Sequence, residues 1–245
     1  MESRTPAQTA GGGQAWPIRT LLVPQGAEYR AVCRGLRAAG GQGVALPQVI
    51  PIPIGIEPVT RRLGPLNLER GGCLLLGLGG GLDPALRVGD GVLGQSCWVV
   101  NTGTVAAVLP PPSPSLITWM QPRLPKSLRL GRVVTSDRLL STPAAKQALH
   151  RLTEADVVDM ESSAVLAALA PRPVAILRVI SDGWDQALPD LTPALTAEGH
   201  LHPWPLAWSL IRQPRAATHL IRGARLGLQR LQALTRQLFL PVPPT

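Results

Sequence analysis

Short apolar runs and longer stretches of helical spacing alternate along most of the chain. Runs that are apolar on both faces, typical of buried strands, lie at residues 19–24, 73–76 and 174–180. Apolar residues at helical spacing cover residues 27–39, and the pattern stops at Gly40-Gly41, as a helix should. Further strands are predicted at residues 44–54, 91–100, 132–135 and 157–159, and further helices at residues 142–152, 162–169 and 204–240. This alternation predicts a single three-layer α/β/α domain with a central mixed sheet and a helical C-terminal tail.

Proline positions refine this picture at four places. Prolines alternate along residues 44–54, which suits an edge strand better than a central one. Thr142-Pro143 predicts the start of a helix, with Thr142 as N-cap and Pro143 as the first helical residue. Residues 109–125 hold six prolines and are predicted to be a loop. Pro214 is expected to break the C-terminal helical segment.

Length and composition favour one α/β domain with loosely attached ends. The chain has 245 residues, and we expect a flexible tail at residues 1–17, the α/β domain at residues 18–200 and a basic helical extension at residues 201–245. No apolar run approaches the roughly 20 residues that span a bilayer, and no signal peptide is visible. The three cysteines lie far apart and show no metal-ligand spacing, so we expect no metal, no cofactor and a cytoplasmic location.

Candidate chemistry gathers where the predicted strands end. Glu28 follows the first strand, a glycine run follows the strand at residues 73–76, Asp159 and Glu161 follow residues 157–158, and Ser181-Asp182 follow the last strand. In open α/β sheets, ligands bind at the carboxyl ends of strands. Each feature also has a purely structural interpretation, since acids favour helix N-termini and glycines favour tight turns.

Four segments taken in order identify a family. GLGGGLDPALRVGD, TSDRLL, VVDMESSAV and VAILRVISDGWD together resemble the superfamily of purine nucleoside phosphorylases and methylthioadenosine/S-adenosylhomocysteine nucleosidases. The resemblance covers roughly residues 21–185 and implies cleavage of a purine N-glycosidic bond. The arginine-rich tail is similar to that of hopanoid-associated phosphorylases, which act on an adenosyl-lipid and release adenine.

On the purine side, the resemblance implies that Asp182 is the general acid near N7 of the base. Ser181 beside it would orient this carboxyl group. Leu139 stands where hydrolases of the family place an aromatic residue facing the purine, so the resemblance assigns it to substrate binding.

On the sugar side, the resemblance implies that Glu28 positions the attacking water and that Glu161 accepts hydrogen bonds from the ribose hydroxyls. A carboxylate there also favours positive charge developing on the sugar. Met160 would pack under the ribose, and Gly79 and Gly80 would shape the loop beside it.

Two departures from the family pattern leave alternatives open. Leu78 stands where the family carries a hydroxyl residue, which puts a phosphate contact in doubt. Phosphorolysis, with phosphate as co-substrate, and hydrolysis therefore both remain, and Arg61 and Arg62 could supply charge from a loop. Together with Leu139, Leu78 also favours an alternative function: a catalytically weak relative that binds nucleoside or lipid without turnover.

The tail and the net charge bear on partners. The chain carries a formal charge of +9 and 24 basic residues, of which only Lys126 and Lys146 are lysines. Residues 199–245 contain six arginines and no acid. Residues 204–240 form either an amphipathic helix packed on its own domain or a basic helix at an anionic membrane surface. We expect an adenosyl nucleoside, small or lipid-linked, as ligand, no nucleic acid, because aromatic stacking residues are scarce, and a homo-oligomer, as is common in the family.

Overall fold

A computed structural model describes residues 16–40, 45–101, 104–200 and 202–240. Most of the expected N-terminal tail, residues 1–15, lies outside the described residues. Trp16, the first described residue, is buried and makes edge-on contacts with Trp119 and Phe239, at ring-centroid distances of 5.9 Å and 5.8 Å. The chain therefore enters the core directly before the first strand.

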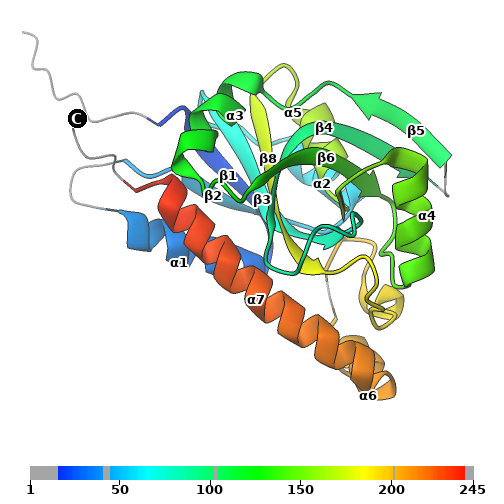
Figure 1. The fold of residues 1–245 in the computed structure, drawn as a ribbon. Coiled ribbons are helices and arrows are strands. Elements are labelled where there is room, and N and C mark those ends of the chain that lie inside the picture. Colours follow the sequence, from blue (N-terminus) through cyan, green and yellow to red (C-terminus); the bar gives the residue numbers. More distant parts are fainter. Residues whose placement is uncertain (1–15, 41–44, 102–103, 201, 241–245) are drawn as a thin grey trace, which may run out of the picture.

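Among the described residues, eight strands form one mixed sheet (Figure 1). The sequence predicts the mixed sheet and seven of these strands but misses the one at Thr104–Leu109. The strands are β1 (Ile18–Pro24), β2 (Gln48–Ile52), β3 (Gly72–Gly81), β4 (Gly91–Asn101), β5 (Thr104–Leu109), β6 (Arg129–Ser136), β7 (Val157–Asp159) and β8 (Val174–Asp182). The order is β2-β1-β3-β7-β6-β4-β5, with β2 at one edge, and β8 pairs with both β3 and β4. The ladders β3–β7–β6–β4–β8 consequently return to β3, so the centre of the sheet closes into a ring.

In the described part of the chain, seven helices surround the sheet: α1 (Ala27–Ala39), α2 (Ile56–Leu63), α3 (Pro114–Met120), α4 (Pro143–Thr153), α5 (Ser162–Leu169), α6 (Pro203–Arg212) and α7 (Pro214–Leu238). Apolar residues of α1, α3 and α7 form one core with the sheet, and those of α2 and α5 form a second core. The sheet therefore lies between two helical layers, and the three-layer α/β/α prediction is confirmed (Figure 1).

Most local predictions hold, because they rest on long apolar patterns or on clear capping residues. The helix at residues 27–39 has the predicted bounds, and Thr142 caps α4 by accepting a hydrogen bond from the Ala145 N–H at 3.2 Å. The predicted loop at residues 109–125 is partly wrong, since it contains α3 and a 3₁₀ turn at Gln121–Arg123. Proline is tolerated in the first turn of a helix, so Pro114 begins α3 instead of preventing it.

The glycine run does not form a tight turn. Residues 77–81 continue β3, which pairs with β8 on one side and with β7 on the other. Neighbouring side chains and backbone come very close here: a Cβ on Gly79 would lie 2.6 Å from Val157 Cγ2. Glycine thus lets three strands approach one another, which a side chain would prevent.

The C-terminal helix α7 packs along α1 and β8 (Figure 1). Its inner face contributes Leu231, Leu234 and Leu238 to the core. At Gly223 and Gly227 the helix approaches the end of β8 so closely that a Cβ on Gly223 would lie 2.0 Å from the Ser181 carbonyl oxygen. Across the described ranges, no helix has both the length and the apolar content needed to cross a bilayer.

Candidate active site

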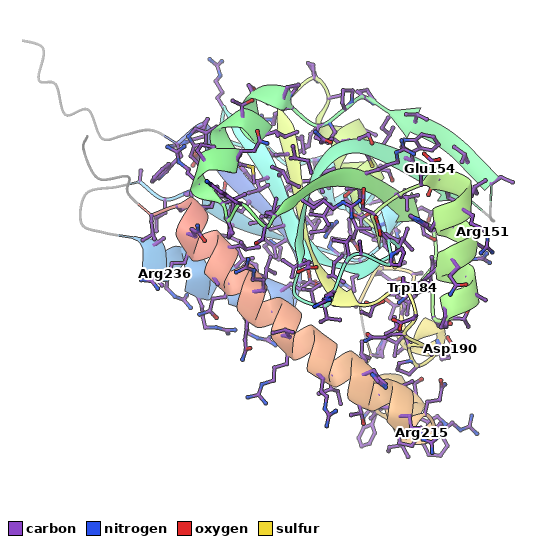
Figure 2. The ribbon with its side chains drawn as sticks, in the orientation of Figure 1. Arg151, Glu154, Trp184, Asp190, Arg215 and Arg236 are labelled. Atoms are coloured by element: carbon purple, nitrogen blue, oxygen red, sulfur yellow. The ribbon has the colours of Figure 1, made fainter. Side chains whose placement is uncertain are left out.

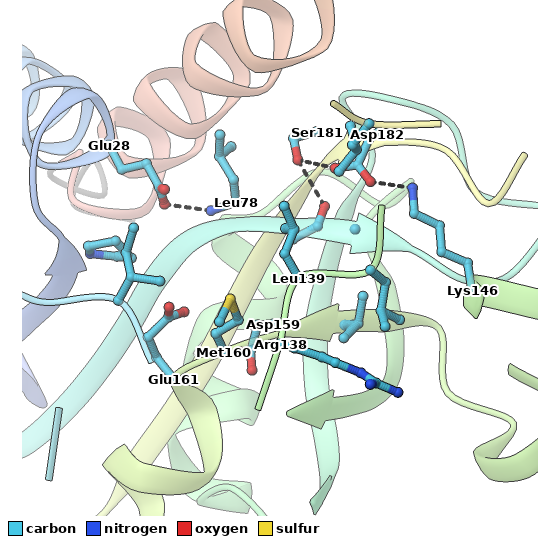
Figure 3. Close-up of a pocket in the computed structure, with 17 residues that line it drawn as sticks. Glu28, Leu78, Arg138, Leu139, Lys146, Asp159, Met160, Glu161, Ser181 and Asp182 are labelled. Atoms are coloured by element: carbon cyan, nitrogen blue, oxygen red, sulfur yellow. Dashed lines mark hydrogen bonds and ion pairs between the residues drawn. The ribbon is translucent and has the colours of Figure 1, made fainter. Parts of the chain in front are cut away.

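One pocket collects the eight residues that the sequence nominates (Figure 3). It has a volume of about 170 Å³ and is lined by residues from α1, β3, β7, β8, α4 and the loop before α4. The nominated residues among its lining are Glu28, Gly79, Gly80, Leu139, Met160, Glu161, Ser181 and Asp182. Leu78 also lines it, together with Arg138, Lys146 and Asp159.

Strand direction explains why residues so distant in sequence meet. β1, β3 and β8 are parallel, so their carboxyl ends lie at the same edge of the sheet. β7 runs antiparallel to β3, with Val158 opposite Gly80, and it ends against the same part of β3. The residues after β7 therefore meet those after β1 and β8 at this edge.

Glu28 lies at one end of the pocket, which we call the sugar end because the family resemblance assigns Glu28 and Glu161 to the sugar side. Its Oε2 accepts a hydrogen bond of 2.7 Å from the Leu78 N–H. Burial raises the pKa of Glu28 from 4.5 to about 7, against the lowering effects of that hydrogen bond and of Arg178. A carboxyl group with a pKa near neutrality is well suited to accept a proton at physiological pH.

Glu161 shares the sugar end. Its carboxyl group accepts a hydrogen bond of 3.1 Å from Arg178 Nη2 and a longer one, 3.4 Å, from the Gly55 N–H. Burial raises its pKa to about 7 as well, and the negative charges of Asp159 and Glu28 add to the rise. Two carboxyl groups that ionise near neutrality therefore face one end of the pocket (Figure 3).

Arg178, on β8, is the cation that pairs with the carboxyl groups at this end of the pocket. Its side chain is completely buried and pairs with Asp159, 2.7 Å from Nε to Oδ2, and with Glu161. Burial alone would lower the pKa of Arg178. The negative charges of Asp159, Glu161 and Glu28 outweigh this effect and raise the pKa above its ordinary value, so the guanidinium stays charged. Its Nη1 has no hydrogen-bond partner in the described structure.

Asp159 is an anchor for this arrangement. Besides Arg178, it accepts hydrogen bonds from the Thr135 hydroxyl at 2.9 Å and from the Ser162 N–H at 3.2 Å. The second of these satisfies the first N–H of α5, whose N-cap residue is Glu161, so Asp159 also has the structural role at a helix N-terminus that the sequence left open.

Asp182 lies at the opposite end, which we call the base end because the family resemblance assigns Asp182 to the purine side. Ser181 Oγ donates to its Oδ1 at 2.6 Å, and Lys146 Nζ donates to its Oδ2. Lys146 comes from α4, is completely buried and also donates to the carbonyl oxygens of Gly183 at 2.8 Å and Gln186 at 3.2 Å. Both carboxyl oxygens of Asp182 thus accept hydrogen bonds (Figure 3).

The walls between the two ends are mainly apolar. Leu139 and Met160 line the pocket, and among the described lining residues none is aromatic. A Cβ on Gly80 would lie 3.2 Å from Asp182 Oδ2, so the absence of a side chain keeps the space beside the acid open. Arg61 and Arg62 lie on α2, not in a loop, and do not line this pocket.

Sequence reasoning missed the two buried basic groups, although each left a signal. Arg178 is the one charged residue within the apolar run at residues 174–180, and a charge inside a buried strand requires partners. Lys146 is one of two lysines in a chain that otherwise uses arginine. Among the described residues, no three His, Cys, Asp or Glu side chains are placed to hold a metal ion.

Comparison with known proteins agrees with this architecture. The family model described as the Phosphorylase superfamily matches residues 73–197, half of the chain. No curated protein sequence matches. Futalosine hydrolase of Helicobacter pylori superposes with a TM-score of 0.66 at 15% identity, covering 89% of this chain and 95% of that one. 5′-Methylthioadenosine/S-adenosylhomocysteine nucleosidase from Neisseria meningitidis, in complex with methylthio-immucillin-A, gives 0.63 at 16% identity, covering 90% and 98%. At such identities the structural likeness establishes the fold.

Proposed function

The chain belongs to the phosphorylase superfamily, and we propose that it cleaves the N-glycosidic bond of an adenosyl-type purine nucleoside, releasing adenine. The observation that carries the proposal is the arrangement of one pocket. Two carboxyl groups with a pKa of about 7, Glu28 and Glu161, lie at one end, and Asp182 lies at the other. Cleavage between a sugar and a base needs a proton acceptor on the sugar side and a proton donor on the base side.

At the sugar end, Glu28 accepts a proton from water as the water oxygen bonds to the anomeric carbon. Arg178 Nη1, which has no partner among the described protein atoms, supports this step by offering a donor to that oxygen. Glu161 accepts hydrogen bonds from the ribose hydroxyls, and its negative charge stabilises the cationic sugar of the transition state. Met160 packs against the sugar.

At the base end, the bond from the anomeric carbon to the purine breaks and its electron pair moves onto the base. Asp182 passes a proton to N7, so the base leaves as a neutral molecule. Ser181 holds the carboxyl group in place through its hydrogen bond to Oδ1. Leu139 contacts the purine face by apolar packing in place of aromatic stacking.

Water is a better co-substrate than phosphate for this pocket. A phosphate at the sugar end would face the carboxyl groups of Glu28 and Glu161, and anion sites need several donors. Leu78 adds no hydroxyl there, and Arg61 and Arg62 lie outside the pocket. We therefore propose hydrolysis.

The substrate we propose carries a bulky apolar group on the ribose 5′ position, as in the hopanoid-associated type. The pocket volume of about 170 Å³ is below the usual range of roughly 300–1,000 Å³ for ligand sites, so a large substituent would extend out of its mouth. Ile54 lines the pocket and its N–H donates to the Gly199 carbonyl oxygen at 3.0 Å, on the segment that leads to α6.

The helix α6 presents an apolar stripe that suits a lipid surface. Trp204, Trp208 and Ile211 follow one helix face and are 86%, 59% and 71% exposed. Arg212 lies over the Trp208 ring at 5.1 Å, and exposed arginines continue along α7, where Figure 2 labels Arg215 and Arg236. We propose peripheral contact with anionic lipid through this face, with aromatic rings at the interface and guanidinium groups at the headgroups.

We also propose that the protein forms a homo-oligomer. The strand β5 lies at the edge of the sheet, with Val108 60% exposed and Val105 37% exposed. An exposed apolar edge strand can pair with the same strand of a second copy. This pairing would cover the exposed valines of both copies. Sedimentation velocity of the wild type and of Val108→Lys tests this. We expect the wild type to sediment as an oligomer and the variant to sediment as a smaller species.

Release of base from a panel of nucleosides, with and without phosphate, tests the activity. The panel holds 5′-methylthioadenosine, S-adenosylhomocysteine, futalosine and an adenosine with a long 5′-alkyl chain. We expect release of adenine without phosphate, and loss of release in Glu28→Gln while the exposed Glu57→Gln behaves as wild type. Binding of these compounds without release would instead support the alternative, a nucleoside- or lipid-binding relative in which Leu78 and Leu139 have replaced catalytic contacts.

Vesicle co-sedimentation tests the lipid surface. We expect binding to anionic vesicles that weakens with salt, and weaker binding for Trp208→Ser and Arg215→Gln. Leu152→Ser and Arg151→Gln on α4 change residues that are also exposed but lie away from α6 and α7, and serve as matched controls (Figure 2). Equal binding by all four variants would contradict the proposal.

A further inference from the structure

Resting on the proposed function, we propose that Lys146 is the source of the proton that the leaving purine takes up, passed on through the carboxyl group of Asp182. Lys146 is fully buried, and its Nζ has three acceptors: Asp182 Oδ2 and the carbonyl oxygens of Gly183 and Gln186. An ammonium group has three N–H donors and no acceptor, so this environment matches the protonated amine.

The hydrogen bonds of Asp182 show why a second group is needed. Oδ1 accepts from the Ser181 hydroxyl at 2.6 Å and Oδ2 accepts from Lys146. A carboxyl group that accepts on both oxygens is arranged as a carboxylate, which has no proton of its own to donate. The Ser181 hydroxyl is too weak an acid to replace it, and the acidic residues Glu28 and Glu161 belong to the other end of the pocket.

Geometry places the relay at the pocket. The oxygen that Lys146 contacts, Oδ2, is also the one that lies beside Gly80, where an added Cβ would be 3.2 Å away. As electrons move onto the purine, the Nζ–H bond breaks and the proton joins Oδ2. The carboxyl O–H bond then breaks and the proton bonds to N7. The net products are a neutral amine, an unchanged carboxylate and a neutral base, and solvent restores the ammonium after the base leaves.

A purely structural interpretation makes Lys146 a counter-ion that holds Asp182 in place. The two roles separate in Lys146→Arg, because a guanidinium keeps the positive charge and the donors but does not give up a proton in proteins. The two roles can also be distinguished by changing the leaving group. 4-Nitrophenolate leaves a ribofuranoside as a stable anion and needs no proton, whereas adenine does.

The experiment measures turnover of 5′-methylthioadenosine and of 4-nitrophenyl β-D-ribofuranoside by wild type, Lys146→Arg, Lys146→Met and Lys126→Arg. We expect both Lys146 variants to lose about 10²- to 10⁴-fold on the nucleoside and only a few-fold on the nitrophenyl riboside. Lys126 is the other lysine, is exposed, and its variant should match wild type on both.

Three outcomes overturn parts of this scheme separately. Near-normal cleavage of the nucleoside by Lys146→Arg would leave Lys146 as a counter-ion only. Equal losses on both substrates would make its role structural. Release of neither leaving group by wild type would overturn the proposed function, and this inference with it.

A second measurement guards against poor folding of the larger arginine and against poor fit of the nitrophenyl group. Lys146→Ala creates a buried space that a small cation can fill. We expect ethylamine in the buffer to restore nucleoside cleavage in proportion to its concentration, and methylguanidine, which keeps its proton, to restore none. Rescue by both compounds or by neither would overturn the proton relay.

Discussion

Both ends of the pocket combine carboxyl groups with a buried cation, but in different proportions. The base end holds one carboxyl group, Asp182, and one buried ammonium group, Lys146, in direct contact. The sugar end holds three carboxyl groups, Glu28, Asp159 and Glu161, around the single guanidinium of Arg178.

In the proposed reaction, this difference in charge balance suits two separate chemical tasks. At the base end the charges match, which suits a group that must hold one proton until the base leaves. At the sugar end the carboxyl groups are buried and outnumber their cation. Burial is the main cause that raises the pKa values of Glu28 and Glu161 to about 7, and neighbouring carboxyl groups add to the rise. An excess of negative charge that a cationic sugar can neutralise stabilises the transition state more than the ground state.

The largest expected effect is at the base end. Asp182→Asn keeps the shape of the side chain but removes the group that carries the proton, so turnover should fall by roughly two to four orders of magnitude while substrate still binds. Steady-state kinetics with Asp185→Asn, an exposed acid three residues on, as control measures this. Near-normal turnover would remove Asp182 from the mechanism.

The next effect is on folding at the sugar end. Arg178→Met leaves three buried carboxyl groups without their cation, and removing one partner of a buried ion pair costs about 3–5 kcal/mol. Urea unfolding at pH 8 should show this loss, and at pH 5, where Glu28 and Glu161 are protonated, the loss should be smaller. Arg19→Met breaks an exposed pair with Glu69 of 3.3 Å and should cost no more than about 1 kcal/mol. Equal costs at both pH values would contradict the charge balance described here.

Glu28 should give the activity its acid limb. Water activation needs the ionised carboxylate, so kcat/KM should rise with pH and level off above about 7, following the raised pKa of Glu28. Glu28→Gln should lower turnover about 100-fold or more and flatten this rise. A pH–rate profile of wild type, Glu28→Gln and Glu57→Gln makes the comparison, and an unchanged limb in Glu28→Gln would assign the titration to another group.

Glu161→Gln should affect turnover more than it affects KM. The variant retains hydrogen bonding to the ribose hydroxyls but loses the negative charge that faces the developing cation, and that charge matters most in the transition state. Initial-rate kinetics separates the two parameters. A change in KM alone would make Glu161 a simple binding residue.

A further expected effect is on the stability of the wild type. Because the folded-state pKa values of Glu28 and Glu161 lie near 7, above the unfolded value of 4.5, their contribution to stability is present below about pH 4.5 and is lost as pH rises to about 7. The melting temperature should therefore fall between pH 5 and pH 7 and then level off. Each kcal/mol of lost stability should lower it by roughly 2–4 °C. Differential scanning calorimetry of wild type and of Glu28→Gln should show a shallower fall in the variant.

Sequence patterns predicted the frame of the site better than its charge balance. The acids after β1, β7 and β8 were recognisable because strand ends and family motifs mark them. Lys146 was not, because its partner Asp182 lies thirty-six residues away and nothing in the spacing along α4 shows that this side chain turns inward. The pairing of β8 with both β3 and β4 was equally hidden, since it depends on how the sheet closes.

The close approach of α7 to β8 sets a condition on when the site can be complete. Gly223 and Gly227 rest against the backbone of Ser181 and against Leu78, and Phe239 fills the core beside Trp16. During synthesis these helical residues leave the ribosome after Glu28, Ser181 and Asp182, because they follow them in the sequence. The nascent chain can form its strands early, yet the support behind Ser181 and Asp182 arrives only with α7, so we expect catalytic competence to appear once α7 has emerged and not gradually as the chain grows.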